Sequence, residues 1–459
     1  MKKNRLLIIL IVFLTVLPSL GAVTIDEIVE GAKNNSPSYQ NYVLTYENGL
    51  LNVASLEEDD KVTVSVDATV NPLLNSGTDE VGISIEPSVT VTLPNDGKTR
   101  ITGGTSLSTR YRDGNTSISG EAGVSHTFDF TGYNSDNADN LLYTSTKYST
   151  EFTYKSAQLN FRKTVLSEIS QIIGLENSIS QSEYSVEKQQ KALDKLDALG
   201  TYSTTSATYI NTQNMLSTCQ QSLEALKEQY SNLLSSYRIL TGLEWEGVEV
   251  GDAPNLELVT YENGNTSVLI ESLSAESSEE NYRQVLAAAN KSSLLTSLSV
   301  GAASSNYTLS GSLVYSSNNW NVSVTPSVNI TSTGKATPYV TIAGHWDNST
   351  SSNSTVNSAL NSAKMAANDY MSALSTYNQN AASYTLQILE YNNKKAEKKA
   401  ELEYQEKLLE NEKTLYSLGL STADSLKGAE LSYQAAETEW KQLVIEGLSL
   451  QCDLDIFAL

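Results

Sequence analysis

Two long segments without proline limit what this chain can fold into. Residues 139–199 and 354–418 are rich in helix-forming residues and contain no Pro. Helices of roughly 60–65 residues are about 90–100 Å long, which far exceeds the helices of ordinary globular domains. Rods of this length can bury an apolar stripe only against other rods, so we expect them to pack as coiled coils.

A shorter helical segment follows each long one, at 206–241 and 423–455, and carries the spacing of a packed seam. Its apolar residues recur at steps of three and four, the pattern of coiled-coil core positions. They are Leu216, Cys219, Leu223, Leu226, Tyr230, Leu233, Tyr237 and Leu240 in the first segment, and Leu426, Ala429, Tyr433, Ala436, Trp440, Leu443, Gly447, Leu450 and Leu454 in the second. The sequence therefore predicts two helical hairpins, with tips near 199–206 and 418–425.

The tips have the residues that end one helix and begin the next. Gly200 and Gly419 suit the left-handed position that ends a helix. Ser206 and Asp424 suit the N-cap of the returning helix.

Eight runs of alternating apolar and polar residues predict strands in two β segments, 61–131 and 297–347. The runs are 62–70, 81–93, 101–111, 118–130, 298–302, 307–315, 320–330 and 339–346. Aromatic residues stand near strand ends, as in membrane strands: Tyr111, Phe128, Phe130, Tyr315, Trp320 and Trp346. A half-buried soluble sheet alternates in the same way, so alternation alone leaves both interpretations open.

Matched landmarks indicate an internal duplication. His126 and His345 are 219 residues apart, and so are Leu-Asp-Ala-Leu-Gly at 196–200 and Leu-Tyr-Ser-Leu-Gly at 415–419. Short helices are expected before the strands, at 24–34 and 37–56 in one half and at 266–276 and 278–296 in the other. We therefore predict a first repeat at 22–241, a linker at 242–265 that forms an equatorial belt, and a second repeat at 266–459.

The amino terminus has the pattern of a secretory signal peptide. Three basic residues precede the apolar run 6–17, and Ser19 and Gly21 are the small residues before a cut at Ala22. This predicts a signal peptide at 1–21; a retained amino-terminal anchor is the alternative.

Composition and motifs argue against several functions. A net charge of −23 argues against nucleic-acid binding. Two Cys and two His are too few for a disulfide framework or a zinc site. Nucleophile elbow, P-loop and dinucleotide patterns are missing from the sequence, so we expect no enzyme activity, no catalytic residues, no cofactor and no metal.

Two stretches resemble the TolC-like outer-membrane efflux protein family. Residues 23–39, Val-Thr-Ile-Asp-Glu-Ile-Val-Glu-Gly-Ala-Lys-Asn-Asn-Ser-Pro-Ser-Tyr, are similar to its opening helix and Asn-x-Pro break, and 415–426 to its hairpin tip. The resemblance implies a mixed α/β membrane protein, a homotrimer with an outer-membrane β-barrel continued by a periplasmic α-helical coiled-coil barrel. It further implies a passive exit duct of a tripartite efflux pump or type I secretion system.

The resemblance also implies partners and sites. Expected partners are outer-membrane lipid, a periplasmic adaptor (membrane fusion) protein and an inner-membrane pump of the RND, ABC or MFS type. The tip residues expected to dock the adaptor are Leu199, Gly200, Ser206, Leu418, Gly419, Leu420 and Asp424, and an acidic constriction is expected at Asp194, Asp197 and Asp424. Turn chemistry and solvated helix charge are the alternative explanations.

The sequence leaves alternatives open for the number of membrane strands and for the function. The family norm is two membrane strands per half and a twelve-stranded trimeric barrel, whereas four alternating runs are present in each half. Either some runs form an extracellular extension, or the barrel differs from its relatives. The rival function is a secreted coiled-coil surface or periplasmic structural protein, such as an adhesin, with a soluble sheet.

Overall fold

The computed structural model describes residues 23–58, 62–75, 80–93, 98–110, 116–129, 136–199, 206–289, 292–303, 306–317, 320–346 and 352–459. The predicted signal peptide lies outside these ranges, and so do Tyr111, Phe130 and Gly200. Within them, no helix combines the length and the hydropathy that crossing a membrane requires.

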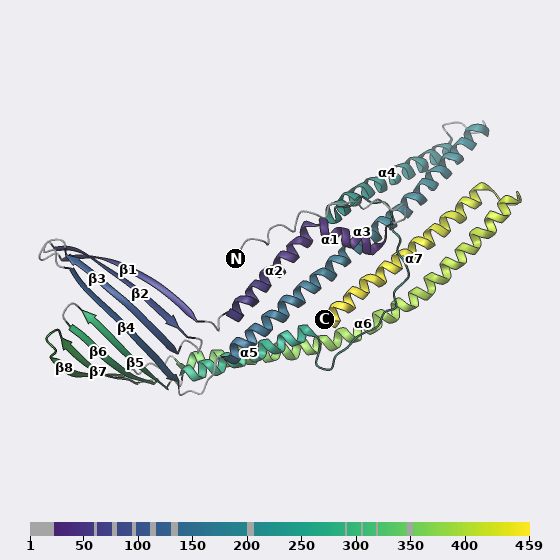
Figure 1. Cartoon of the computed structure of the whole chain (residues 1–459). Coiled ribbons are helices and arrows are strands. Elements are labelled where there is room, and N and C mark those ends of the chain that lie inside the picture. Colours follow the sequence, from purple (N-terminus) through teal and green to yellow (C-terminus); the bar gives the residue numbers. More distant parts are fainter. Residues whose placement is uncertain are drawn as a thin grey trace. The chain divides into compact units, whose positions relative to one another are not determined.

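In both halves of the chain, helices come before and after the strands in sequence (Figure 1). The first half contains α1 (Ile25–Asn35), α2 (Pro37–Glu58), β1 (Thr63–Asn75), β2 (Glu80–Thr92), β3 (Thr99–Arg110), β4 (Thr116–Asp129), α3 (Asp136–Leu199) and α4 (Ala207–Thr241). The second contains α5 (Thr266–Ala289), β5 (Ser292–Ala303), β6 (Asn306–Ser317), β7 (Trp320–Thr331), β8 (Ala336–Trp346), α6 (Ser352–Ser417) and α7 (Ala423–Ala458). The long helices α3 and α6 have 64 and 66 residues, which confirms the two predicted rods.

The described residues form two compact units. One comprises the described residues up to Thr45 together with Thr153–Thr260 and Asn380–Leu459, and the other comprises Tyr46–Phe152 and Tyr261–Gln379. The first unit holds the helical hairpin tips, and the second holds all eight strands. His126 and His345 lie in β4 and β8, the last strand of each half; the duplication itself stays a prediction.

One sequence prediction about α5 was wrong. We expected two short helices, at 266–276 and 278–296, but α5 is a single helix that ends at Ala289, and β5 already begins at Ser292. Leu294 and Leu295 fit the apolar spacing of a helix as well as that of a strand. In the structure they belong to β5, where Leu294, Thr296, Leu298 and Val300 lie on one face. The β segment therefore starts five residues before the predicted 297.

Helix α1 begins with a capping box. The Thr24 backbone N–H donates to Glu27 Oε2 at 2.9 Å, and Thr24 Oγ1 accepts from the Glu27 backbone N–H at 3.3 Å. The helix ends before Ser36, because Pro37 lacks the N–H that would continue it and instead begins α2.

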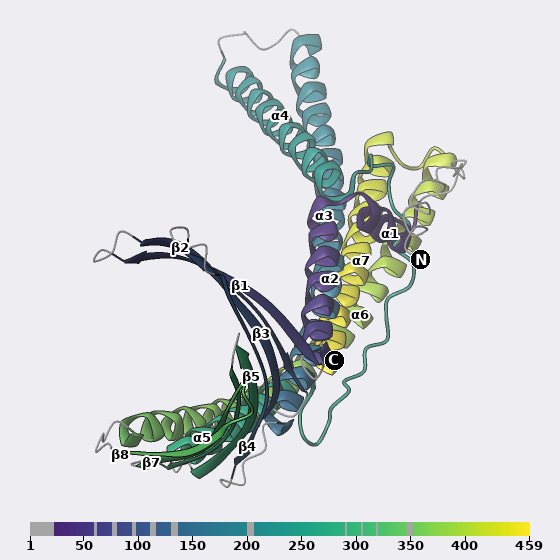
Figure 2. The same ribbon diagram turned by 60° about the vertical axis from the view of Figure 1, so that its left-hand side comes forward.

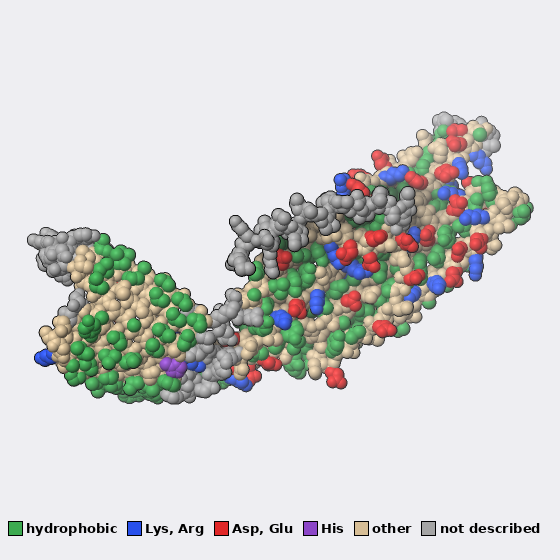
Figure 3. All heavy atoms as spheres, in the orientation of Figure 1, with side chains coloured by type: hydrophobic (Ala, Val, Ile, Leu, Met, Phe, Trp, Pro, Cys, Tyr) green, Lys and Arg blue, Asp and Glu red, His purple; other side chains and the backbone are tan. Residues whose placement is uncertain are grey.

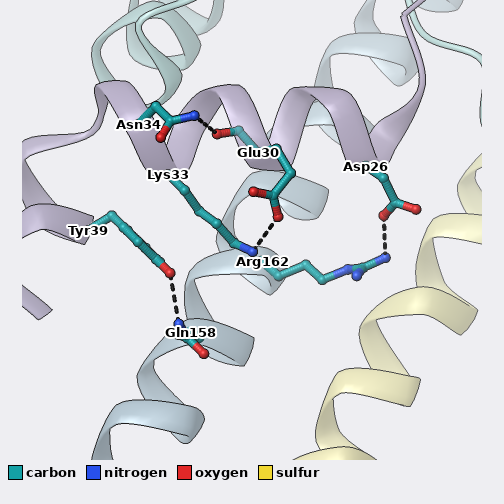
Figure 4. A network of polar contacts seen from close by, with 7 residues as sticks. All are labelled: Asp26, Glu30, Lys33, Asn34, Tyr39, Gln158 and Arg162. Carbon is teal, nitrogen blue, oxygen red and sulfur yellow. Dashed lines mark hydrogen bonds and ion pairs between the residues drawn. The ribbon is translucent and has the colours of Figure 1, made fainter. Parts of the chain in front are cut away.

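Polar contacts attach α1 and the start of α2 to α3 (Figure 4). Arg162 on α3 forms an ion pair with Asp26 at 2.8 Å, and Gln158 Nε2 donates to the Tyr39 hydroxyl at 2.9 Å. On α1 itself, Lys33 pairs with Glu30 at 2.6 Å. Asp26 and Glu30 are exposed, so these ion pairs add little to stability, whereas Tyr39 is buried in the core.

The main core of the first unit lies beneath these contacts. Buried side chains recur along α3 at steps of three and four, so they form one stripe. The stripe comprises Phe161, Val165, Leu166, Ile169, Ile172 and Ile173, and it packs with Ile25, Ile28, Val29 and Ala32 of α1. All seam residues predicted in α4 and α7 are buried or half-buried, which confirms that prediction.

Individual hydrogen bonds and a second hydrophobic core hold the linker residues 243–265 against the helices. Lys395 Nζ donates to the carbonyl oxygens of Ala253 and Pro254, both at 3.1 Å. Leu256 packs with Tyr391, Leu443, Leu450 and Leu454. The linker is therefore attached to α6 and α7 without forming a helix or strand of its own.

Helices α6 and α7 approach each other closely at Gly447. A Cβ at this position would collide with the hydroxyl and ring of Tyr391, whose side chain is buried. Gly428, on the same helix, has nothing within 4 Å of the corresponding position. The two glycines therefore differ in packing while sharing a helix.

We expect Gly447→Ala to lower the free energy of unfolding by about 1–3 kcal/mol, because Tyr391 must move out of a filled core. The matched control Gly428→Ala should raise it by about 0.5–1 kcal/mol through helix propensity. Denaturant titration followed by circular dichroism measures both. Equal effects of the two substitutions would contradict the close approach.

Candidate functional site: a two-faced sheet and two hairpin tips

The eight strands form one open antiparallel sheet. Their order is β1-β2-β3-β4-β5-β6-β7-β8, so every strand pairs with its neighbour in sequence. The pairing β4–β5 joins the two halves over eleven residue pairs, from Ser119–Ala303 to Asp129–Ser293. The sheet is not closed, and β1 and β8 are its edges.

Two interior prolines coincide with short gaps in the ladder. The β2–β3 pairing skips Glu86 and Pro87, and the β6–β7 pairing skips Thr325 and Pro326. Proline lacks the backbone N–H that a ladder hydrogen bond needs, so these gaps have a direct chemical cause. The β2–β3 and β6–β7 pairings continue on both sides of their gaps, so the sheet remains one. Figure 2 shows that its strands are curved.

One face of the sheet is apolar on every strand. The register places Val66 beside Val89, Ile101 beside Val124, and Val300 beside Leu309, so the alternating apolar residues of neighbouring strands fall on one side. We call this surface the apolar face; its exposed large residues are Val64, Val66, Val70, Ile83, Ile85, Val89, Ile101, Leu107, Ile118, Val124, Phe128, Leu298, Val300, Tyr307, Leu309, Leu313, Tyr315, Trp320, Val322, Ile330, Val340, Ile342 and Trp346. Even on the central strand β5, Leu298 is 57% and Val300 51% exposed, so no described element covers this face.

Acidic side chains are absent from the visible part of this face, and the few basic ones lie at its margin (Figure 3). In Figure 3, acidic and basic side chains gather over the helices, whereas the sheet turned toward the viewer carries hydrophobic side chains and no acidic ones. Soluble monomeric proteins rarely expose a continuous apolar patch of this extent.

Aromatic residues border the apolar face at the end where β1 follows α2. Phe128 pairs in register with Leu294, Leu294 with Tyr315, and Trp320 with Trp346. The Trp320 and Trp346 rings lie 6.4 Å apart. His126 extends the border, since its ring packs edge-on against Phe128 at 4.5 Å and its Nδ1 lies 2.7 Å from Thr99 Oγ1. An aromatic row at one end of an apolar band is typical of a membrane interface.

The opposite face, which we call the polar face, carries Ser, Thr, Asn and a few charged residues. Its charged side chains on the described strands include Asp67, Glu86, Arg100 and Glu121. Ser84 Oγ donates to Glu86 at 2.9 Å. A hollow of about 610 Å³ lies against this face, lined by Glu86, Gly104, Ser106, Glu121, Thr308 and Asn329 among others. The polar face is therefore the concave side of the sheet.

The α6–α7 tip confirms one predicted cap and corrects another. Gly419 is left-handed with φ 74°, its N–H donates to Tyr416 O, and the Leu420 N–H donates to Leu415 O. These two bonds form a Schellman motif. The N-cap of α7 is Thr422 and not Asp424 as predicted: Thr422 Oγ1 accepts from the Ser425 backbone N–H at 3.2 Å. Asp424 lies in the first turn, where its charge complements the helix dipole.

The α3–α4 tip is described only in part. Ser206 is the N-cap of α4, as predicted, and its hydroxyl accepts from the Tyr209 backbone N–H at 3.3 Å. Leu199 ends α3, while Gly200 lies outside the described residues. Leu418 and Leu420, in the other tip, expose their side chains.

The three acidic residues of the expected constriction have different surroundings. Lys191 on α3 pairs with Asp424 at 2.8 Å and with Glu187 at 2.7 Å. The hydrogen bond to Asp424, followed by that to Glu187, raises the pKa of Lys191, so this ammonium group stays charged throughout the neutral range. Asp194 instead accepts from Gln190 on its own helix at 2.7 Å, and Asp197 is exposed. Lys191 did not stand out in the sequence, because its partner is 233 residues away.

A further polar anchor lies where the linker begins. Glu176 Oε1 accepts from the Tyr230 hydroxyl at 2.8 Å and from Trp245 Nε1 at 2.7 Å. Burial and the bond to Glu176 raise the pKa of Tyr230 to about 12, so its hydroxyl remains a donor. This site joins α3, α4 and the linker. Among the described residues, no group of three or more His, Cys, Asp or Glu is arranged to hold a metal.

Comparison with solved structures identifies the fold. The outer membrane protein VceC from Vibrio cholerae matches with a TM-score of 0.51 at 12% identity, over 95% of this chain and 96% of that one. The chain has the fold of VceC. The MtrE outer membrane channel of Neisseria gonorrhoeae gives a TM-score of 0.49 at 13% identity, over 97% and 94% of the two chains. The Campylobacter jejuni CmeC outer membrane channel gives 0.49 at 10%, over 97% and 90%.

Sequence comparison adds less. Residues 28–255 match the family model described as the TP096X N-terminal domain, which covers slightly less than half of the chain. No curated protein matches in sequence.

We expect Asp424→Asn to speed hydrogen exchange of amides in the first turns of α7, because the contact with Lys191 is weakened. Asp194→Asn is the matched control and should leave these amides unchanged, since Asp194 bonds within its own helix. Both partners of the Lys191–Asp424 pair are solvated, so the effect should be modest and should shrink in 1 M salt. An effect of Asp424→Asn that persists in high salt would show that this ion pair is not its cause.

Proposed function

We propose that this chain is a subunit of an outer-membrane exit duct that conducts exported molecules passively. The observation that carries the proposal is the two-faced sheet: an apolar face exposed on all eight strands, backed by a concave polar face. An apolar face of this kind is stable against lipid, and a polar concave face is suited to line water. The fold shared with VceC, described as an outer membrane protein, supports the same location.

Further parts of the proposal follow the sequence resemblance to the TolC-like family. In it, three copies form a β-barrel in the outer membrane, and the helices continue it as a periplasmic tunnel built from the tandem repeats 22–241 and 266–459. The hairpin tips, including Leu418 and Leu420, dock a periplasmic adaptor. An inner-membrane pump of the RND, ABC or MFS type, or a type I secretion system, supplies the energy.

The rival proposal, a secreted coiled-coil adhesin with a soluble sheet, requires the apolar face to be covered by protein. The described residues offer no cover for Leu298 and Val300 at the centre of the sheet. The exposed apolar face therefore favours the duct.

Lipid contact is tested with tryptophan fluorescence. Two of the four tryptophans, Trp320 and Trp346, lie in the aromatic row. In vesicles of lipid brominated near the headgroup, we expect about half of the emission to be quenched, because bromine quenches only indoles that touch lipid. Trp320→Phe combined with Trp346→Phe should abolish the quenchable part, whereas Trp440→Phe, in a helix core, should preserve it. Equal quenching of all variants would contradict a lipid-facing row.

Conduction and selectivity are tested together in planar bilayers. We expect the wild-type protein to form cation-preferring pores, because Asp67, Glu86 and Glu121 outnumber Arg100 on the polar face. Glu121→Gln should lower the cation-to-anion permeability ratio measured from reversal potentials, while Ser299→Ala, on the same face without a charge change, should not. Pores with a reversal potential insensitive to Glu121→Gln would exclude the polar face as the lining, and absence of pores would exclude the duct.

A further inference from the structure

The two edge strands of the sheet are unprotected. β1 has thirteen residues and β8 eleven, and no described strand pairs with their outer sides. Natural proteins shield such edges with charges, bulges or covering elements. Here β8 contains no Asp, Glu, Lys or Arg, and β1 contains Asp67 alone. Pro72 and Pro338 remove one backbone donor each, which leaves most of both edges free to pair.

The directions of the edge strands suit pairing between copies. β1 follows α2 and runs away from the helix, whereas β8 precedes α6 and runs toward it. Because the number of strands is even, β8 of one copy and β1 of the next are antiparallel when placed side by side. The same geometry already joins all seven neighbouring pairs within the chain.

The two faces also remain continuous across such a pairing. Copies related by rotation about one axis present the same face outward, so Val66 of β1 and Ile342 of β8 fall on a common apolar surface. Both side chains are 72% exposed, the highest values among the strand residues of the apolar face. The hollow on the polar face makes that face the inner side of a ring.

We infer that β8 of one copy pairs with β1 of the next copy of this chain, and that three copies thereby close one barrel of twenty-four strands. This inference rests on the proposed trimeric duct and replaces the twelve-stranded barrel implied by the family resemblance. All eight strands, of eleven to fourteen residues, belong to one continuous ladder, so none is left over as an extension. Barrel diameter grows roughly in proportion to strand number, so the membrane pore is about twice as wide as a twelve-stranded one.

Disulfide trapping between the two edges tests the pairing. Thr341→Cys on β8 is combined in turn with Ser65→Cys, Asp67→Cys, Thr69→Cys or Asn71→Cys on β1. All five positions lie on the polar face, and their side chains are exposed. The background carries Cys219→Ala and keeps Cys452, whose burial raises the thiol pKa to about 11 and keeps it unreactive.

The expected result is a ladder of covalent dimers and trimers on non-reducing gels for at least one β1 position, which collapses to the single chain on reduction. The control pair Ser119→Cys with Thr341→Cys joins β4 and β8, which are four strand spacings or about 19 Å apart, and should give no ladder. The protein is used as purified in detergent, and its mass and bilayer conductance are measured on the same sample.

The outcomes separate the inference from the proposed function. A conducting trimer without a β1–β8 ladder keeps the duct and overturns the edge pairing. A disulfide formed within one chain also overturns it, because the sheet then closes on itself. A monomer that does not conduct overturns both.

Discussion

Every strand of a sheet has backbone N–H and C=O groups that need partners, and this requirement governs the structure of the chain. Seven antiparallel pairings satisfy the interior strands, with gaps only beside Pro87 and Pro326. The backbone groups on the outer sides of β1 and β8 have no partner strand among the described residues. In lipid such groups have no water to bond, so a sheet of this kind is complete only when its edges meet. The pairing that we propose between copies gives these backbone groups partners and keeps the apolar face continuous.

The apolar side chains of the two units recur with different sequence periods. The sheet alternates every two residues and so has an apolar and a polar face without a core of its own. The helices repeat every three to four residues, and their stripes meet in a core around Ile169 and Ile172. Charges are concentrated on the helices, where Arg162, Lys191 and Lys395 each bridge separate segments. The chain thus combines a surface suited to lipid with one suited to water.

The sequence predicted elements better than it predicted contacts. The long helices, the α4 and α7 seams and all eight strands follow from local periodicity, and the structure confirms them. The boundary between α5 and β5 was missed because Leu294 and Leu295 fit both periods. The sequence predicts Asp424 as an N-cap because acidic residues suit that position, yet Thr422 lies two residues earlier and fills it. The continuity of the sheet across β4–β5, and the Lys191–Asp424 pair, depend on residues more than 150 positions apart, which no local pattern encodes.

The strand count of each half has an evolutionary meaning. Both halves contain an even number of strands, and each returns the chain to the side from which its helices extend. A hairpin inserted into either half would therefore lengthen the sheet while leaving the helices and the order of all other elements unchanged. In the proposed barrel, duplication or loss of hairpins would therefore change the width of the pore independently of the helices.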